Sequence, residues 1–81
     1  MNDQQLSVFK DEFFAYYTDL LISTEIDSNK NLIVYVRPDL DFDETVAYIS
    51  DSILDTVVFE EHLDVYVYPF GSNEFITLGI N

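Results

Sequence analysis

The C-terminal part of the chain contains two runs in which aliphatic residues alternate with polar, aromatic or small ones. The runs are LDVYVYPF at 63–70 and EFITLGI at 74–80, with Gly71-Ser72-Asn73 between them. Alternation predicts strands that bury one face, and a short connection containing glycine predicts that the two strands pair as an antiparallel hairpin. The chain is therefore expected to form a sheet that its other segments must cover.

Two earlier segments carry apolar residues at helical spacing. Residues 3–18 predict the first helix, with Asp3 as a favourable N-cap residue. A second helix is expected to begin at Asp41 or Asp43, because Asp41 and Glu44 fit the reciprocal capping pattern of a helix start. Its apolar stripe is formed by Val46, Ile49, Ile53 and Val57.

Between these helices, residues 20–26 and 32–37 predict another hairpin around the turn sequence DSNKN. The alternative is that the first helix continues to Ile22. Residues 57–62, VVFEEH, are either the end of the second helix or an extended link. The fold class is therefore α+β in a single domain over 1–81. Two helices pack on a mainly antiparallel sheet of about four strands, in the order α-β-β-α-β-β.

Charge narrows the classes of partner. Sixteen acidic residues face three lysines and arginines, a formal net charge of -13, while the hydrophobic fraction of 48% is too high for a disordered acidic tail. Nucleic acid and anionic membranes would repel such a surface, so a basic protein is the expected partner. Cysteine is absent, and no signal peptide or membrane-spanning run is recognisable, which favours a cytoplasmic protein.

Metal binding and catalysis find little support. DLDFDETVAYIS at 39–50 begins like a calcium loop, but Glu44 stands where the loop needs glycine and Ser50 where it needs glutamate. His62 is the only histidine, which disfavours a transition-metal site. There is no glycine-rich phosphate loop, and the many carboxylates do not by themselves make a matched acid and base. We therefore expect no enzymatic activity, no metal and no cofactor.

The same segment is a candidate binding surface. If residues 39–43 are extended, alternate carboxylates share a face about 7 Å apart and imitate consecutive phosphates of a nucleic-acid strand. A simpler role for Asp41 and Asp43 is helix capping, and both roles can hold together. The carboxylates expected at the partner surface are Asp39, Asp41, Asp43, Glu44, Asp51, Asp55, Glu60 and Glu61, with Asp64 as an addition.

Tight inhibitors also bury apolar anchors, because peripheral charges mainly accelerate association while desolvated contacts slow dissociation. The candidates are Leu40 and Phe42, which lie between the aspartates, and Tyr66 and Tyr68, which share one face of a predicted strand. For the two tyrosines, ordinary packing within the sheet is the alternative.

Residues 44–54, ETVAYISDSIL, resemble the motif region of uracil-DNA glycosylase inhibitor proteins, which are small acidic DNA mimics often encoded by phages. In that family a Glu-Ser-Ile element enters the DNA cleft of the enzyme, and a nearby hydrophobic pocket accepts an apolar side chain. The resemblance implies that Glu44, Thr45 and Val46 form the inserted element, and that Val46, Ile49 and Ile53 line the pocket. Threonine replaces serine and valine replaces isoleucine here, and Asp51-Ser52-Ile53 offers a second alignment.

Three classes of function follow. The first is an inhibitor that occupies the basic nucleic-acid-binding cleft of a DNA repair enzyme, with uracil-DNA glycosylase as the named target, or of a CRISPR effector. The second is an antitoxin or immunity protein that neutralises a basic nuclease. The third is an interaction module that dimerises through a sheet edge, so that monomer and dimer both stay open. A bacterial cell is the expected setting, with a phage gene as one source.

Overall fold

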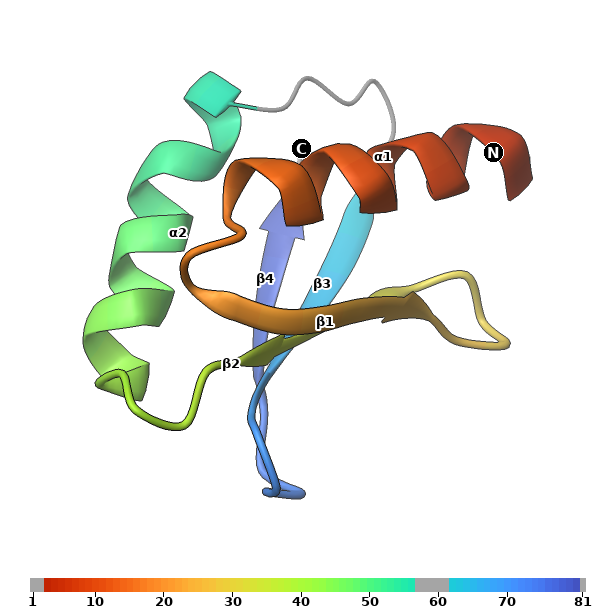
Figure 1. The fold of residues 1–81 in the computed structure, drawn as a ribbon. Helices are drawn as coiled ribbons and strands as arrows, with labels where there is room; N and C mark the ends of the chain where they lie inside the picture. Colours follow the sequence, from red (N-terminus) through yellow and green to blue (C-terminus); the bar gives the residue numbers. More distant parts are fainter. Residues whose placement is uncertain (1–2, 57–61, 81) are drawn as a thin grey trace.

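The computed structural model describes residues 3–56 and 62–80, with the side chains of 54–56 excepted (Figure 1). The elements are α1 (Asp3–Tyr16), β1 (Leu21–Ile26), β2 (Leu32–Val36), α2 (Phe42–Thr56), β3 (Leu63–Pro69) and β4 (Ile76–Ile80). The predicted α+β class and the order α-β-β-α-β-β are confirmed. The first helix ends at Tyr16, earlier than predicted, and β1 forms where a longer helix was the alternative. The ambiguous link lies mostly outside the described residues.

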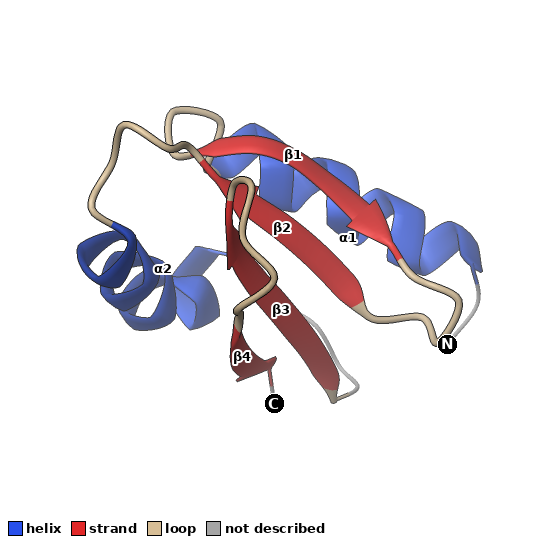
Figure 2. Cartoon of the chain, turned by 90° about the horizontal axis from the view of Figure 1, so that it is seen from below, coloured by secondary structure: helices blue, strands red, loops and turns tan. Residues whose placement is uncertain are grey.

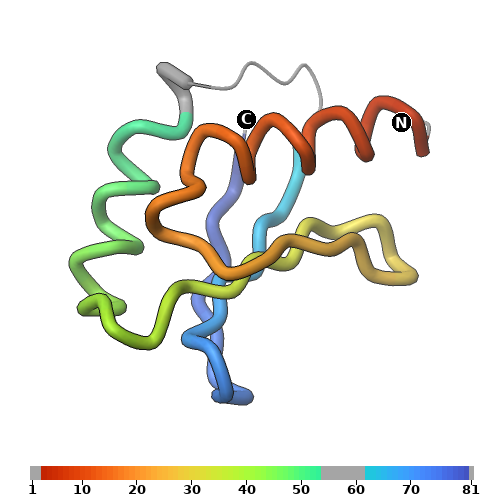
Figure 3. The backbone as a smooth tube through the Cα atoms, in the orientation of Figure 1, coloured from red at the N-terminus to blue at the C-terminus, as the bar shows by residue number. Residues whose placement is uncertain are grey.

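The four strands form one mixed sheet in the order β1-β2-β3-β4. Both predicted hairpins are confirmed, because β1 pairs with β2 and β3 pairs with β4 in antiparallel fashion. The central pair, β2 and β3, is parallel. Parallel neighbours need a crossover connection, and α2 provides it by carrying the chain back along the sheet (Figure 3).

The turn of the second hairpin follows the sequence prediction. Gly71 has a φ of 84°, in the left-handed region that favours glycine, and the amide of Ser72 donates to the carbonyl of Pro69 at 3.1 Å. The turn therefore depends on Gly71, the residue from which the sequence predicts it.

Both helices pack on the same face of the sheet, which places the core between helices and strands (Figure 2). Alternate residues of each strand point into this core because successive side chains of a strand face opposite sides. The buried hydrophobic residues of the described chain are Leu6, Phe9, Phe13, Tyr17, Leu21, Leu32, Val34, Val36, Val46, Ile49, Ile53, Leu63, Val65, Val67 and Ile80. Among the described elements, no helix covers the opposite face, which we call the open face.

Aromatic rings connect α1 to the rest of the core. The ring centroids of Phe9 and Phe13 are 6.0 Å apart, and those of Phe13 and Tyr17 are 4.9 Å apart. Tyr17 is almost fully buried, and its hydroxyl forms a 2.7 Å hydrogen bond with the hydroxyl of Ser52 on α2. This bond satisfies the polar end of a buried tyrosine and ties the two helices together.

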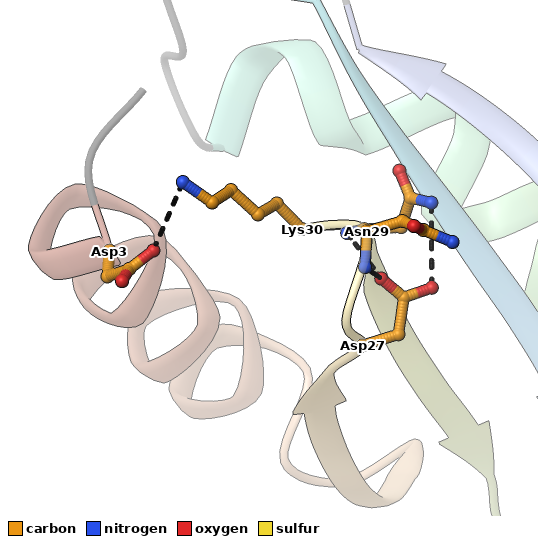
Figure 4. Close-up of polar contacts among 5 residues, drawn as sticks. Asp3, Asp27, Asn29 and Lys30 are labelled. Carbon is orange, nitrogen blue, oxygen red and sulfur yellow. Dashed lines mark hydrogen bonds and ion pairs between the residues drawn. The ribbon is translucent and has the colours of Figure 1, made fainter.

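The turn between β1 and β2 is organised by one carboxylate (Figure 4). Oδ1 of Asp27 accepts hydrogen bonds from the backbone amides of Asn29 and Asn31, each at 2.9 Å. Lys30 lies between them with a φ of 64°, and its Nζ is 3.4 Å from Oδ1 of Asp3 on α1. A lysine thus occupies a left-handed conformation that favours glycine.

Lys30→Gly is expected to raise the free energy of unfolding by about 1 kcal/mol, because glycine adopts this φ without steric cost. The lost ion pair with Asp3 is exposed and contributes little. Urea denaturation monitored by circular dichroism measures the change. Asn29→Gly is the control, since Asn29 has no positive φ and gains only chain entropy on unfolding. Equal loss of stability in both variants would contradict the expectation.

Candidate functional site

The segment that leads into α2 is a turn. The amide of Leu40 donates to the carbonyl of Arg37 at 3.3 Å, and Pro38 occupies the second position of the turn, where its fixed φ is favourable. The guanidinium of Arg37 donates through Nη2 to the carbonyl of Thr18 at 3.2 Å, which fastens the turn beside the end of α1. Asp39 is exposed within this turn. The extended row of carboxylates expected over 39–43 is therefore wrong, because a turn and a helix start replace the strand geometry that it required.

Asp41 caps α2, as predicted. Its Oδ1 accepts a hydrogen bond from the amide of Glu44 at 2.9 Å, and its carbonyl accepts from the amide of Thr45 at 3.0 Å. The hydroxyl of Thr45 also donates to this carbonyl at 2.7 Å. Asp43 and Glu44 then occupy the first turn of the helix, where negative charge interacts favourably with the helix dipole.

The solvent side of α2 carries carboxylates around one aromatic ring. Glu44 and Asp51 are both exposed and lie two helical turns apart, a rise of about 10.5 Å. Tyr48 lies between them on the same side, with 55% of its surface exposed. We call the exposed acidic residues of α2 and of the turn before it, together with Tyr48, the acidic face; its residues are Asp39, Asp41, Asp43, Glu44, Tyr48 and Asp51.

Tyr48 was missing from the residues expected at the partner surface. Its position follows Glu44 by four residues and precedes Asp51 by three, off the apolar stripe of the helix, and this spacing was the signal for it. Its ring packs edge-on against buried Tyr17 at a centroid distance of 6.3 Å. The exposed ring is therefore held in place by the core.

The two lysines and the single arginine contact groups outside the acidic face. Lys10 Nζ lies 3.5 Å from a carboxylate oxygen of Asp11, Lys30 pairs with Asp3, and Arg37 binds a backbone carbonyl. Within residues 3–56 and 62–80, no ion pair joins a cation to a carboxylate of the acidic face. Its like charges repel one another, and a partner that supplies lysine or arginine would relieve this repulsion.

Several residues assigned to the partner surface are buried instead. Thr45 is 6% exposed and Val46 is 8% exposed, and Ile49 and Ile53 are also part of the core. Of the predicted inserted element, Glu44 alone is exposed in this structure. The expected anchors Leu40 and Phe42 are half-buried and pack against the core. A partner would contact Thr45, Val46 or a pocket formed by the stripe of α2 only if the core opened, so these roles stay predictions.

The remaining expected carboxylates divide into two groups. The side chain of Asp55 and the whole of Glu60 and Glu61 lie outside the described residues. Asp64 lies on β3, and its Oδ1 is 2.8 Å from Nε2 of His62. Because Leu63 and Val65 point into the core, Asp64 faces the open side of the sheet, away from α2.

The open face carries an aromatic cluster. It consists of Tyr35 on β2, Tyr66 and Tyr68 on β3, and Phe75 just before β4. Ring centroids lie 5.6 Å apart for Tyr35 and Tyr68, 5.1 Å for Tyr68 and Phe75, and 5.2 Å for Tyr66 and Phe75. Tyr66 and Tyr68 therefore share a face, as predicted, and their packing within the sheet is compatible with contact to a partner.

Glu25 on β1 adds a carboxylate to this cluster. The hydroxyl of Tyr35 donates to Oε1 of Glu25 at 2.9 Å. This hydrogen bond raises the pKa of Tyr35 above 10.0, and desolvation and the negative charge of Glu25 act in the same direction. The folded state therefore favours the neutral phenol, and this contribution to stability, present below pH 10.0, is lost as pH rises through the higher folded pKa.

Glu25→Gln is expected to lower the pKa of Tyr35, because it removes the charge that the phenolate would face. The absorbance of tyrosinate is measured during an alkaline titration. In Glu25→Gln the last part of the titration curve should move to lower pH. Tyr35→Phe is the control, since it removes the ionisation of Tyr35 from the titration curve. An unchanged alkaline end in Glu25→Gln would show that Glu25 does not control this titration.

Neither a cluster of metal ligands nor a membrane-spanning helix is found among the described residues. Residues 3–56 and 62–80 contain no group of three or more potential ligands placed to hold a metal ion. No helix in the same part of the chain combines the length and apolar character needed to cross a membrane.

No family model, curated protein or solved structure matches this chain. The resemblance to uracil-DNA glycosylase inhibitors thus rests on the sequence alone. It comes chiefly from the motif in residues 44–54, with Tyr68-Pro69-Phe70 and Leu78-Gly79-Ile80 as a similar late strand pair. The target and residue roles that it implies stay predictions.

Proposed function

We propose that the protein is a small acidic inhibitor that binds the basic nucleic-acid-binding cleft of another protein in place of DNA. The observation that carries this proposal is the acidic face, where exposed Glu44 and Asp51 lie on either side of exposed Tyr48 on a helix capped by Asp41. A helix holds its carboxylates at set positions, which distinguishes this surface from a flexible polyanion. A cleft that binds phosphates through lysine, arginine and backbone amides offers the complementary chemistry.

Tyr48 adds what charge alone does not provide. Charges at the rim of an interface mainly set the association rate and its dependence on salt, whereas buried aromatic anchors set the dissociation rate. The tyrosine ring stands between Glu44 and Asp51, so carboxylates that dock on basic side chains would bring it against the partner. The acidic face thus combines charge steering with one anchor.

Uracil-DNA glycosylase is the first proposed target, because the motif in residues 44–54 resembles the inhibitors of that enzyme. A CRISPR effector, or a nuclease neutralised by an antitoxin or immunity protein, would present a basic cleft of the same chemistry. In each case the protein acts by binding in the cytoplasm of a bacterial cell, without catalysis or a cofactor, and a phage gene is one source.

The test begins with the named target. Increasing amounts of the protein are added to bacterial uracil-DNA glycosylase, and uracil excision from duplex DNA is measured. We expect excision to stop near one equivalent and to recover at high salt, where charge steering is screened. Undiminished excision at several equivalents would remove uracil-DNA glycosylase as the target.

The wider class is tested with immobilised protein and a nuclease-treated bacterial lysate. Bound proteins are identified, and each is tested for release by duplex DNA and for loss of its own DNA binding. We expect to capture a DNA-binding protein for which DNA and the inhibitor compete. If every captured protein binds DNA and the inhibitor simultaneously, the proposal of DNA mimicry is rejected.

A further inference from the structure

We propose that the open face of the sheet is a second contact surface, at which arginine side chains of the partner protein stack on the aromatic cluster. The inference rests on the proposed function in one respect, because both require a basic protein partner. It assigns a different surface, since the acidic face belongs to α2. Figure 2 shows both helices on one side of the sheet, and the alternating burial of β2 and β3 puts Tyr35, Tyr66 and Tyr68 on the other side.

The cluster is available for contact in the described structure. Tyr35, Tyr66 and Tyr68 are half-buried by one another, and Phe75 is 49% exposed. Their strand neighbours Val34, Val65 and Val67 fill the core on the other side of the sheet. The rings therefore contribute little to the helix-covered core, yet four aromatic side chains from β2, β3 and the residue before β4 meet at centroid distances of 5.1–5.6 Å.

The charges around the cluster define the occupant. Glu25 is hydrogen-bonded to Tyr35, Asp64 lies on the same face of β3 as Tyr66, and exposed Glu74 precedes Phe75 in the chain. Ring faces and carboxylates both attract cations. A second copy of the chain would bring another net charge of -13 to this surface, and nucleic acid would bring phosphates, so both are disfavoured.

Arginine fits this combination better than lysine. Its planar guanidinium stacks on aromatic faces while its edge donates paired hydrogen bonds to a carboxylate, whereas the lysine ammonium is a compact and strongly hydrated charge. At the open face, a guanidinium over Tyr35 would have the carboxylate of Glu25 beside it, because Oε1 of Glu25 is 2.9 Å from the hydroxyl of Tyr35. We therefore assign to this surface an arginine-bearing segment of a protein.

The experiment uses the whole protein and two synthetic peptides that differ only in having arginine or lysine at the same positions, spaced by glycine and serine. Binding is measured by calorimetry, and two-dimensional nuclear magnetic resonance locates the peptide through shifts of assigned ring signals. We expect the arginine peptide to bind about threefold to tenfold more tightly than the lysine peptide. The largest shifts are expected at Tyr35, Tyr68 and Phe75.

Two variants test the stacking. Tyr68→Leu keeps an apolar side chain but removes the ring, and Glu25→Gln removes the nearby charge. Each is expected to weaken binding of the arginine peptide by about threefold to tenfold, with the melting temperature recorded to confirm folding. Tyr16→Leu is the matched control, because Tyr16 is an exposed tyrosine at the end of α1, outside both proposed surfaces, and it should leave peptide binding unchanged.

Three results would overturn the inference. They are equal affinity for the two peptides, ring shifts confined to the acidic face, and undiminished arginine binding in both Tyr68→Leu and Glu25→Gln. Tighter binding of single-stranded DNA than of the arginine peptide, or a dimer that buries the aromatic cluster, would assign the face to another occupant. The proposed function has its own test, because competition between DNA and the protein for a captured DNA-binding protein is measured without the arginine and lysine peptides.

Discussion

Simultaneous replacement of Asp43, Glu44 and Asp51 by lysine is expected to lower the affinity for the basic partner by about 100-fold or more. The three side chains are exposed on α2 and form no ion pair within the described residues, so their replacement removes attraction and adds repulsion at the proposed contact. Surface plasmon resonance at two salt concentrations measures the effect, which should appear mainly in the association rate and shrink at high salt.

The matched control reverses the same number of charges on the other helix. Asp3, Asp11 and Glu12 are exposed on α1, and their replacement by lysine changes the net charge equally. Both variants place lysine in the first turn of a helix, where it opposes the helix dipole, and the control also removes the exposed ion pairs of Asp3 with Lys30 and of Asp11 with Lys10. The melting temperature of each variant is therefore recorded beside its affinity. If the two triple variants lost affinity to the same extent, the protein would act through its net charge alone, and the acidic face would have no special role.

Phe13→Ala is expected to lower the free energy of unfolding by about 3–5 kcal/mol. Phe13 is completely buried, and its ring lies between those of Phe9 and Tyr17, so truncation leaves a cavity where α1 packs on the sheet. A domain of this length has a total stability of about 4–12 kcal/mol, so the variant would lose a large part of it. Thermal and urea denaturation measure the loss.

Two controls separate the cavity from general effects of mutation. Val8→Ala truncates an exposed side chain of the same helix and should change stability by less than about 0.5 kcal/mol. Phe13→Leu keeps most of the buried volume and should give an intermediate loss. A stability change for Phe13→Ala as small as that for Val8→Ala would mean that α1 does not depend on this ring.

The two proposed surfaces make different demands on a partner. The acidic face selects a basic cleft by the positions of its carboxylates, and the open face selects arginine by stacking. Because Tyr17 and Ser52 join α1 to α2 and the valines of β2 and β3 fill the space beneath, one core supports both surfaces. Variants of each surface can therefore be compared in one folded protein.

Local patterns in the sequence determined the helices, the two hairpins and the cap at Asp41. In each case the evidence lies between residues that are close along the chain. The capping contact joins Asp41 to Glu44, and the hairpin turn depends on the left-handed φ of Gly71. Short-range hydrogen bonds and allowed dihedral angles set these features, so the sequence alone predicts them.

The tertiary structure decided the features that depend on distant residues. Distant parts of the chain pair β2 with β3 in parallel and bring both helices to one side of the sheet, and the alternating burial of these strands puts the aromatic cluster on the other side. The same packing buries Thr45 and Val46, which the sequence predicts at a partner surface, and exposes Tyr48, which it does not. No local pattern states which strands become neighbours or which helix side meets the sheet, because contacts across the whole chain decide both. The sequence thus determined the elements and the charge, and the fold decided which residues a partner can contact.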